Sequence, residues 1–394
     1  MKAIRLREGK ERSLLRRHPW VFEGSIAKGK ADPGETVRIE ASDGRFLAWG
    51  AYSPLSAIRV RAWSFDEAER IDAGFFGRRV QRAVALRARL AVDSDAVRLV
   101  HGEADGLPGL VVDRYGDTLV AQVGFAGTER WKAVIADALL SAVDAARLYE
   151  RSDLGVRKLE GLPEQQGWLR GDGPTQLQIR EHGWTLSVDI AQGHKTGTYL
   201  DQRDNRQHFA KAVRHFGCAE VLNCYSYTGG FTLAALAGGA QQVTSVDSSA
   251  PALQAAMQHV RLNGFEASRH ETADADVNAY MRAALAQGRR FDAIVLDPPK
   301  FAHTAAQAER ASRAYKDINR LALMLLRPGG LLFTFSCSGG IGPELFHKIV
   351  AGAGIDAGVD GAIVQRMAAA ADHPTTLQFP EGDYLTGLAL LARA

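Results

Sequence analysis

From about Gln192 onward, short apolar runs alternate with longer amphipathic segments. Short apolar runs bounded by turn-forming residues are typical of buried strands, and strands that alternate with helices form a parallel sheet with right-handed crossovers. In such an α/β sheet, ligands bind outside the carboxyl ends of the strands. We therefore expect functional residues directly after strands at 219–224, 242–246, 269–272, 291–296 and 330–337, with helices at 233–237 and 305–326 and a last strand at 384–391.

Two of these strand ends carry residues suited to chemistry on a nucleobase. One strand runs into Asp297-Pro298-Pro299-Lys300-Phe301, and the next ends in Phe335-Ser336-Cys337-Ser338. Prolines fix the backbone φ, a carboxylate accepts hydrogen bonds from a base edge, and a thiolate attacks a ring carbon. Taken singly, the first segment is also typical of a strand-ending loop, and a lone cysteine of a small buried hydrophobe. Their order and spacing indicate that Asp297 binds a base and that Cys337 is a nucleophile.

A loop with paired glycines follows the strand at 219–224. It reads Asn223-Cys224-Tyr225-Ser226-Tyr227-Thr228-Gly229-Gly230, and such loops let a ligand approach the backbone at a helix N-terminus. Asp247 follows Gly229 by eighteen residues, about the separation at which an acid reaches a ribose diol. A plain turn and a helix cap explain the same residues, although Ser248 and Ser249 would cap equally well. The loop is not Gly-x-Gly-x-x-Gly, which disfavours a dehydrogenase.

The strand at 269–272 leads to a further acidic segment. Asp276, followed by Val277, lies where a carboxylate could bind the amino group of adenine. A solvated helix start explains these residues equally well.

These segments resemble the class I S-adenosylmethionine-dependent methyltransferases, and the whole chain resembles the bacterial 23S rRNA cytosine-C5 methyltransferases of the large-subunit methyltransferase I family. The resemblance extends to the segments at 13–22, 102–110 and 193–203. It implies a Rossmann-like methyltransferase domain with a parallel sheet and an antiparallel terminal strand, preceded by a small PUA-like β-barrel and an α+β module. It implies S-adenosylmethionine as cofactor, 23S rRNA as partner, and these cofactor-binding residues: Lys195, Thr196, Gly197, Tyr199, Asp201, Arg203, Asn223, Tyr225, Ser226, Tyr227, Thr228, Gly229, Gly230, Asp247, Ser248, Asp276, Val277 and Asp297.

Cytosine methylation at C5 explains why a cysteine is needed. Carbon 5 is a poor nucleophile until a thiolate adds to carbon 6, yet an ordinary thiol with a pKa of about 8.5 is only a few per cent ionised at neutral pH. The positive charge of Lys300 would favour the thiolate of Cys337. Many RNA cytosine-C5 methyltransferases carry a second cysteine where this chain has Pro299, so a single-cysteine mechanism is implied and the base that removes the C5 proton is not identified. Methylation of an amino or ring nitrogen needs no thiol and is the first alternative; a non-catalytic RNA-binding or assembly factor is the second.

The first 190 residues read as two further modules. Short alternating runs at 35–39, 45–48 and 57–63 predict a small β-barrel. Beyond it we expect helices at 72–91 and 128–143, strands between 98 and 123, and a hairpin at 177–190 that turns at His182-Gly183. The predicted domains are therefore 1–70, 71–190 and 191–394.

The charge of the N-terminal segment favours an RNA partner, whereas the net charge of the whole chain does not. The net charge is only +3, but residues 1–30 hold nine Lys or Arg against three Glu. A basic face suits phosphate contacts, and we expect Arg16, Arg17, His18 and Trp20 to bind RNA. A solvated surface explains the charge equally well.

Composition limits the remaining function classes. The N-terminus lacks a signal-peptide core and no apolar run is long enough for a membrane helix, so we expect a cytoplasmic protein without a membrane partner. Three cysteines without metal-ligand spacing predict neither a disulfide framework nor a metal site, and we interpret Cys218 and Cys224 as structural. The sequence leaves open the target nucleotide, the use of naked RNA or an assembled particle, and whether the chain forms a homodimer.

Overall fold

The computed structural model describes residues 2–302 and 307–393. Contacts divide the chain into two compact units. Unit 1 comprises residues 1–181, 187–200 and 371–382, and unit 2 comprises residues 182–186, 201–370 and 383–394. The N-terminal and central modules thus fall into one unit, and boundaries near residues 70 and 190 remain our proposal.

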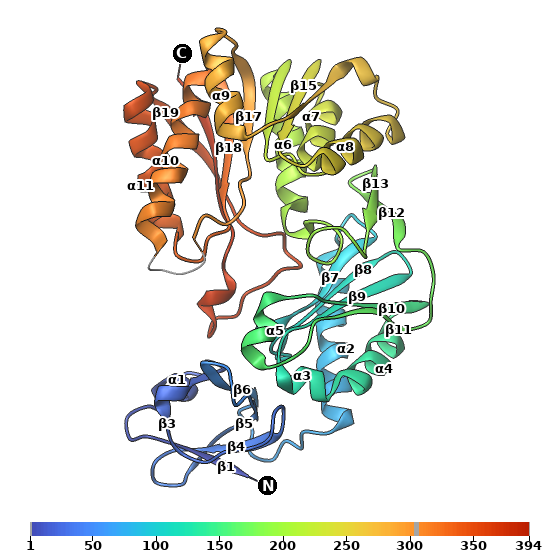
Figure 1. Cartoon of the computed structure of the whole chain (residues 1–394), viewed down its shortest axis with the longest axis vertical. Coiled ribbons are helices and arrows are strands. Elements are labelled where there is room, and N and C mark those ends of the chain that lie inside the picture. Colours follow the sequence, from blue (N-terminus) through green and yellow to red (C-terminus); the bar gives the residue numbers. More distant parts are fainter. Residues whose placement is uncertain (1, 303–306, 394) are drawn as a thin grey trace. The chain divides into compact units, whose positions relative to one another are not determined.

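The N-terminal part of unit 1 is a six-stranded sheet with the order β2-β6-β5-β4-β1-β3 (Figure 1). Its strands alternate buried and solvent-facing residues, as in β4, where Val37 and Ile39 are fully buried. The expected β-rich module is therefore present. Its elements are β1 (Ala3–Leu6), α1 (Arg12–Leu15), β2 (Trp20–Phe22), β3 (Ile26–Lys28), β4 (Thr36–Glu40), β5 (Phe46–Tyr52) and β6 (Ile58–Ser64).

The central part of unit 1 is a five-stranded mixed sheet with the order β11-β10-β9-β8-β7. Helix α2 is capped by Asp72, whose side chain accepts the Phe75 N–H at 3.0 Å, and it buries Phe75 and Phe76 in the core of this module. The single helix predicted at 128–143 is wrong, because the chain forms two helices with Trp131 between them. The elements are α2 (Ala73–Leu90), β7 (Ala96–His101), β8 (Leu110–Tyr115), β9 (Thr118–Val123), α3 (Ala126–Arg130), α4 (Lys132–Ala142), β10 (Arg147–Ser152), α5 (Gly155–Glu160) and β11 (Gln165–Arg170).

The hairpin predicted at 177–190 is present as β12 (Gln176–Glu181) and β13 (Trp184–Asp189). His182 and Gly183 connect the strands with φ values of 51° and 84°. Positive φ at both central residues fits the right-handed twist of a two-residue hairpin turn.

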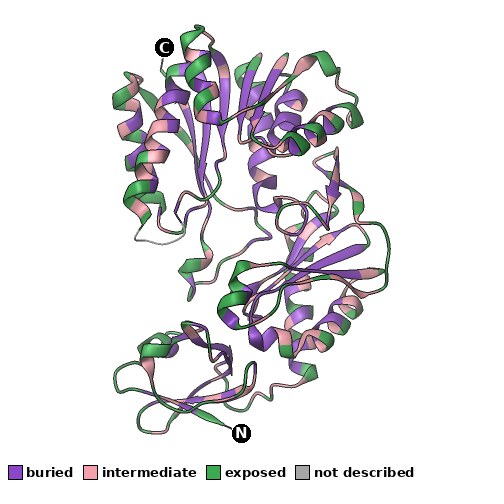
Figure 2. Ribbon diagram, in the orientation of Figure 1, coloured by how far each residue is buried: buried purple, intermediate pink, exposed green. Residues whose placement is uncertain are grey.

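Unit 2 is a seven-stranded sheet with the order β16-β15-β14-β17-β18-β20-β19. All neighbours from β16 to β18 are parallel, whereas β20 is antiparallel to both β18 and β19, which confirms the Rossmann-like sheet with an antiparallel terminal strand. Helices α6, α7 and α8 lie on one face and α9, α10 and α11 on the other (Figure 1). Figure 2 shows the central strands buried and the outer helix faces exposed.

The elements of unit 2 follow the predicted alternation. The helix predicted from Ala305 is described only from Ala308, because residues 303–306 lie outside the described residues. The elements are α6 (Arg203–Phe216), β14 (Glu220–Cys224), α7 (Gly230–Gly238), β15 (Gln242–Asp247), α8 (Ala250–Leu262), β16 (His270–Asp274), α9 (Val277–Ala286), β17 (Phe291–Leu296), α10 (Ala308–Leu325), β18 (Leu326–Ser336), α11 (Pro343–Ala357), β19 (Gly361–Met367) and β20 (Thr386–Ala392).

Candidate active site at the carboxyl edge of the sheet

Four parallel strands of unit 2 end side by side. Cys224, the last residue of β14, pairs with Val246 of β15 and with Leu296 of β17, and Leu296 pairs with Thr334 of β18. The segments that begin at Tyr225, Asp247, Asp297 and Cys337 therefore leave the same edge of the sheet. This edge is where a ligand is expected in an open α/β sheet.

The thiol of Cys337 lies beside the Asp-Pro-Pro loop. Its Sγ is 3.8 Å from the carbonyl oxygen of Pro298, and the side chain is only partly buried. Asp297 is also partly exposed, and Lys300 is exposed in the same loop. The structure thus brings the predicted nucleophile next to the predicted base-binding segment, while the role of Lys300 stays a prediction.

Ser338, the residue after the cysteine, holds this loop in place. Its Oγ accepts the backbone N–H groups of Phe301 at 3.1 Å and Ala302 at 3.2 Å. Because these bonds use both lone pairs of the hydroxyl oxygen, its O–H donates to the Tyr315 hydroxyl, 3.0 Å away. Ser338 therefore connects the end of β18 both to the Asp-Pro-Pro loop and to helix α10.

Tyr315 completes this anchor from helix α10. Its ring is fully buried and packs on Phe301 and Phe346, with ring centroids 4.8 Å and 5.7 Å away. Burial raises the pKa of the Tyr315 hydroxyl, so it stays protonated and acts as a hydrogen-bonding group. Sequence reasoning missed both Tyr315 and Ser338, although a polar residue at every second position of the buried segment from Thr334 to Ser338 was a signal.

The other two cysteines lie away from solvent. Cys218 and Cys224 are buried, and burial raises the pKa of Cys218 to about 11 and that of Cys224 still further. Neither thiol is ionised at neutral pH, which agrees with their interpretation as structural.

The glycine loop after β14 is strained. Tyr225 and Tyr227 have φ values of 57° and 45°, a left-handed conformation that costs on the order of 1 kcal/mol for each non-glycine residue. Gly229 has a φ of 79°, and a Cβ there would lie 2.7 Å from the Cβ of Ala256 in α8. Gly229 is thus required by backbone conformation and by close packing of the loop on α8.

One polar atom in this loop is buried without a hydrogen-bond partner among the described residues, the Oγ of Ser226. An orphaned hydroxyl between two strained tyrosines indicates that the loop is completed by a ligand.

Asp247 binds the backbone of the same loop. Its carboxylate accepts the Tyr227 N–H at 2.8 Å and the Ser249 N–H at 2.9 Å. Helix α8 is capped by Ser249, which accepts the Ala252 N–H, so Asp247 does not serve as the helix cap. The predicted neighbour Ser248 is exposed. Each carboxylate oxygen has a second lone pair, which leaves Asp247 able to accept ligand hydroxyls.

Asp276 begins a helix, as the alternative interpretation expected. Its side chain accepts the Ala279 N–H at 2.9 Å and caps α9, and Val277 is buried in the core. The carboxylate is exposed at the end of β16, so an additional role toward adenine stays a prediction.

A buried polar chain lies beneath the glycine loop. The Asn223 amide donates to Thr232 at 3.0 Å, Thr232 contacts the Ser245 hydroxyl at 2.7 Å, and Ser245 contacts His270 at 2.8 Å. Burial lowers the pKa of His270 to about 4, so the ring is neutral at pH 7. The amide group of Asn223 is therefore part of this buried hydrogen-bond network.

The segment from Lys195 to Arg203 is divided between the units. Lys195, Thr196, Gly197 and Tyr199 belong to unit 1, whereas Asp201 and Arg203 belong to unit 2. Within unit 2, the Asp201 carboxylate accepts the Tyr384 hydroxyl at 2.7 Å, and Arg203 is fully buried. Their place in a cofactor site stays a prediction.

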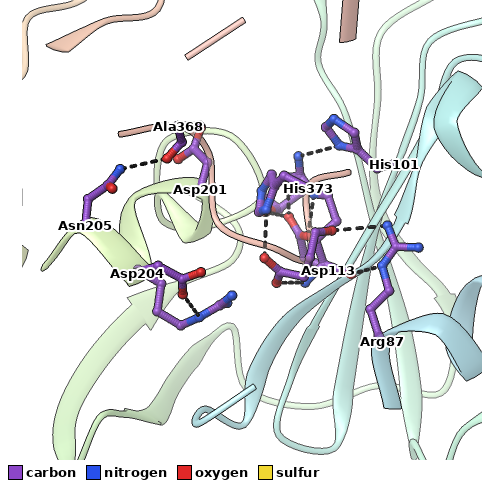
Figure 3. A network of polar contacts seen from close by, with 12 residues as sticks. Arg87, His101, Asp113, Asp201, Asp204, Asn205, Ala368 and His373 are labelled. Carbon is purple, nitrogen blue, oxygen red and sulfur yellow. Dashed lines mark hydrogen bonds and ion pairs between the residues drawn. The ribbon is translucent and has the colours of Figure 1, made fainter. Parts of the chain in front are cut away.

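Thr196 is built into a buried network of unit 1. It donates to Asp113 at 2.6 Å and contacts the Tyr115 hydroxyl at 2.8 Å, while Arg98 makes a bidentate ion pair with Asp113. Figure 3 shows Asp113 near Arg87, His101 and His373 in this network. The segment 371–382 joins through Asp372, whose side chain accepts the Arg98 backbone N–H at 2.9 Å.

The residues predicted to bind RNA lie in the N-terminal module. Arg16 and Arg17 are exposed after α1, and Arg17 has a φ of 61°. Trp20 is partly buried; its indole N–H donates to Glu103 at 2.8 Å, and its ring packs against His18 and Phe379. Trp20 therefore has a packing role, while the neighbouring Phe22 is exposed.

The described part of the chain has neither a membrane-spanning helix nor a metal-binding cluster. No helix there is both long and apolar enough to cross a membrane. Likewise, no group of three or more His, Cys, Asp or Glu side chains in that part is arranged to hold a metal ion.

Comparison with known proteins identifies two domains. Residues 4–65 match the model of a PUA-like domain, and residues 158–388 match that of an S-adenosylmethionine-dependent methyltransferase. Ribosomal RNA large subunit methyltransferase I of Klebsiella pneumoniae (strain 342) is 51% identical over 389 residues, covering 98% of this chain and 96% of the relative. The protein of the same name from Escherichia coli O139:H28 is 49% identical over 98% of both chains.

Solved structures agree on the fold. A SAM-dependent methyltransferase from Streptococcus mutans superposes with a TM-score of 0.85 at 21% identity, covering 99% of this chain and all of the other. A methyltransferase complexed with SAH gives a TM-score of 0.86 at 22% identity, with the same coverage.

The cofactor is S-adenosylmethionine, and the residues present fit it. The orphaned Ser226 hydroxyl and the Asp247 lone pairs lie at the loop where backbone approach and a ribose acceptor are needed. The chain belongs to the ribosomal RNA large subunit methyltransferase I family of S-adenosylmethionine-dependent methyltransferases, which carry a PUA-like N-terminal domain.

Proposed function

We propose that this protein methylates carbon 5 of a cytosine in 23S rRNA through a covalent adduct between Cys337 and carbon 6 of the base. The observation that carries the proposal is the approach of the Cys337 Sγ to 3.8 Å from the Pro298 carbonyl oxygen. This contact lies at the sheet edge from which the glycine loop also starts. The proposed nucleophile Cys337, the proposed base-binding Asp297 and the glycine loop could therefore all act on one substrate. A group-transfer site requires its reacting groups to be held together in this way. The bacterial rRNA substrate implies a cytoplasmic location.

The proposed reaction uses the chain's own groups in order. The Cys337 thiolate forms a bond to carbon 6, and the electron pair of the C5–C6 double bond makes carbon 5 nucleophilic. Asp297 binds the N3 or N4 edge and supports protonation at N3 as the adduct forms. When bound, the cofactor would supply an electrophilic methyl group: its bond to the sulfonium sulfur would break as carbon 5 takes the methyl group, and S-adenosylhomocysteine would leave. Loss of the C5 proton then restores the double bond, the C6–Sγ bond breaks, and the thiolate is released.

The cofactor residues are proposed as a set. Asp247 would accept the ribose hydroxyls, the backbone and side chains from Tyr225 to Gly230 would surround the methionine part, and Asp276 with Val277 would face the adenine. Lys300 would favour the thiolate, and Lys195 to Arg203 would contribute a wall of the site. Arg16 and Arg17, with His18 and Trp20, would contact the RNA.

Replacement of the nucleophile tests the proposal. Cys337→Ala should bind S-adenosylmethionine with wild-type affinity in calorimetry but lose methyl transfer to 23S rRNA transcripts. The matched control, Cys218→Ala, should retain activity because its thiol is buried. Wild-type enzyme should also form a denaturation-resistant adduct with RNA that carries 5-fluorocytosine at the target, because fluorine prevents the proton loss.

The same experiment separates the competing reactions. A Cys337→Ala enzyme that methylates at a rate comparable to wild type would overturn C5 chemistry and favour methylation of a ring or amino nitrogen. Wild-type protein that binds rRNA and the cofactor without methyl transfer would favour the assembly-factor interpretation.

A further inference from the structure

Unit 1 contains a pocket of about 260 Å³ that is separate from the carboxyl edge described above. It lies over strands β8 and β9, where Val111 and Gln122 are paired neighbours. Leu154 and Val156 before and within α5 and Phe379 of the segment 371–382 form apolar walls, and Arg61 of β6 contributes a charged group. Drug-sized ligand pockets measure roughly 300–1,000 Å³, so this pocket suits a smaller, ring-sized ligand.

Gln122 indicates that the pocket is built for a ligand. Its side chain is nine-tenths buried, yet its amide makes no hydrogen bond to any residue that the structure describes. The amide atoms are not among the buried polar atoms that lack a partner, so they are open to the space inside the pocket. The free amide offers both a donor and an acceptor to a ligand in the pocket.

Arg61 is a second buried polar group of the wall that keeps hydrogen-bonding capacity. Its guanidinium stacks over Phe125 at 4.6 Å and donates one hydrogen bond, from Nη1 to Glu160 at 2.8 Å. Its Nε is 3.6 Å from Glu103, too far for a hydrogen bond, and is buried without a partner among the described residues. Because this Nε is closed off from solvent, only the remaining N–H groups of the two Nη atoms can reach a ligand.

The local charge disfavours a phosphate as the ligand. Arg61 carries one positive charge, whereas Glu103 and Glu160 beside it carry two negative charges. An anion would meet this excess of negative charge in a partly desolvated site. A neutral ring with donors and acceptors on its edge meets no such penalty.

The phenylalanine in the pocket wall favours a planar ligand. Phe379 of the wall packs edge-on against Trp20 at 4.8 Å and lies 5.6 Å from His18. Gly102, Gly109 and Gly124 also line the pocket and add no side chains to it. Unpaired RNA bases are recognised by this combination of aromatic or flat apolar walls and hydrogen bonds to the base edge.

We propose that this pocket binds one unpaired nucleobase of the RNA substrate, a second base distinct from the methylated one, with the Gln122 amide and the Arg61 guanidinium reading its edge. The proposal rests on the proposed RNA methylation. It assigns to the N-terminal and central modules a base-specific contact in addition to phosphate contacts, so that RNA selection depends on a sequence position outside the methylated nucleotide.

The test uses the full-length protein and a 23S rRNA fragment around the methylated nucleotide. Gln122→Met keeps the side-chain length but removes both hydrogen-bonding groups. It should raise the Kd for the fragment about tenfold, as expected for loss of a base contact, while S-adenosylmethionine affinity stays unchanged. The control Gln166→Met alters an exposed glutamine of β11 in the same sheet and should leave RNA affinity unchanged.

An abasic scan of the fragment identifies the base. For wild-type protein, one abasic position other than the target should weaken binding about tenfold, and for Gln122→Met the same change should have no further effect. If Gln122→Met fails to fold, Gln122→Asn, which stays polar but is shorter by one carbon, replaces it. Unchanged RNA affinity in the folded variant, or equal losses at every abasic position in both proteins, overturns the pocket proposal. Wild-type protein that neither binds nor methylates the fragment overturns the proposed function instead.

Discussion

Replacing Ser338 by Ala should loosen the Asp-Pro-Pro loop without touching the thiol. The substitution removes the acceptor of the Phe301 and Ala302 N–H groups and the donor to Tyr315. Ala302 is fully buried, so its N–H would be left unsatisfied at a cost of about 1–3 kcal/mol, whereas the N–H of the half-buried Phe301 can reach water. With the lost Tyr315 bond, we expect the free energy of unfolding to fall by about 2–4 kcal/mol.

The loss of activity should exceed the loss of cofactor binding. A misplacement of about 1 Å in a catalytic segment can cost on the order of a hundredfold in rate, so the single-turnover rate of methyl transfer should fall about ten- to a hundredfold. Affinity for S-adenosylmethionine should not change, because the glycine loop and Asp247 make none of these hydrogen bonds. Denaturant unfolding, single-turnover kinetics and calorimetry measure the three quantities.

Two further variants make this prediction refutable. Tyr315→Phe removes one bond of the anchor and should cost less, about 1 kcal/mol, and the double variant should cost less than the sum because the two hydroxyls share a bond. Ser312→Ala, whose hydroxyl donates to Ala308 within the same helix, should change stability by less than about 0.5 kcal/mol. A Ser338→Ala enzyme with wild-type rate and stability would show that the loop does not depend on this anchor.

Three other predictions concern the cofactor, pH and RNA. Asp247→Ala should weaken S-adenosylmethionine binding about ten- to a hundredfold in calorimetry, through loss of a charge-assisted hydrogen bond and of the Tyr227 contact; unchanged affinity would contradict the proposed ribose site. The folded-state pKa of His270 is about 4, below its ordinary value of 6.5, so its contribution to stability is complete above about pH 6.5 and is lost as pH falls toward 4; His270→Gln should flatten this part of a plot of unfolding free energy against pH. Arg16→Ala should weaken RNA binding uniformly across sequences and reduce the slope of log K against log salt by about 1 in salt-titrated binding; an unchanged slope would remove Arg16 from the phosphate contacts.

The sequence predicted which residues lie at the sheet edge, but it did not predict the hydrogen bonds that hold the loops there in place. Residues after parallel strands must meet at one edge, so the positions of Asp247, Asp297 and Cys337 followed from the alternation of strands and helices alone. The bond between Ser338 and Tyr315 could not be predicted in this way, because it joins residues on different elements and depends on how α10 packs on the sheet. Local periodicity contains no such information.

The central module was predicted least completely because its core includes charges. Strand β10 and helix α5 bear Glu150, Arg151 and Arg157, a composition typical of an exposed surface. Arg157 is nevertheless fully buried, where it donates to the carbonyls of Val123 and Pro163 and to Glu129. Groups on three separate segments bind its Nε and Nη1, whereas its Nη2 has no hydrogen-bond partner among the described residues. Sequence composition alone could not reveal this burial.

Strand β18 shows how one alternating pattern serves two faces of the site. Phe333 and Phe335 pack on Phe209 of α6 and Phe231 of α7, whereas Ser338 contacts Tyr315 of α10 on the other face. The strand ends at Ser336, and the Cys337 thiol beyond it lies beside the carbonyl oxygen of Pro298 in the Asp-Pro-Pro loop. Substitutions at Ser338 remove the acceptor of the Phe301 and Ala302 N–H groups, so their effect on rate should arise through the loop and not through the thiol itself.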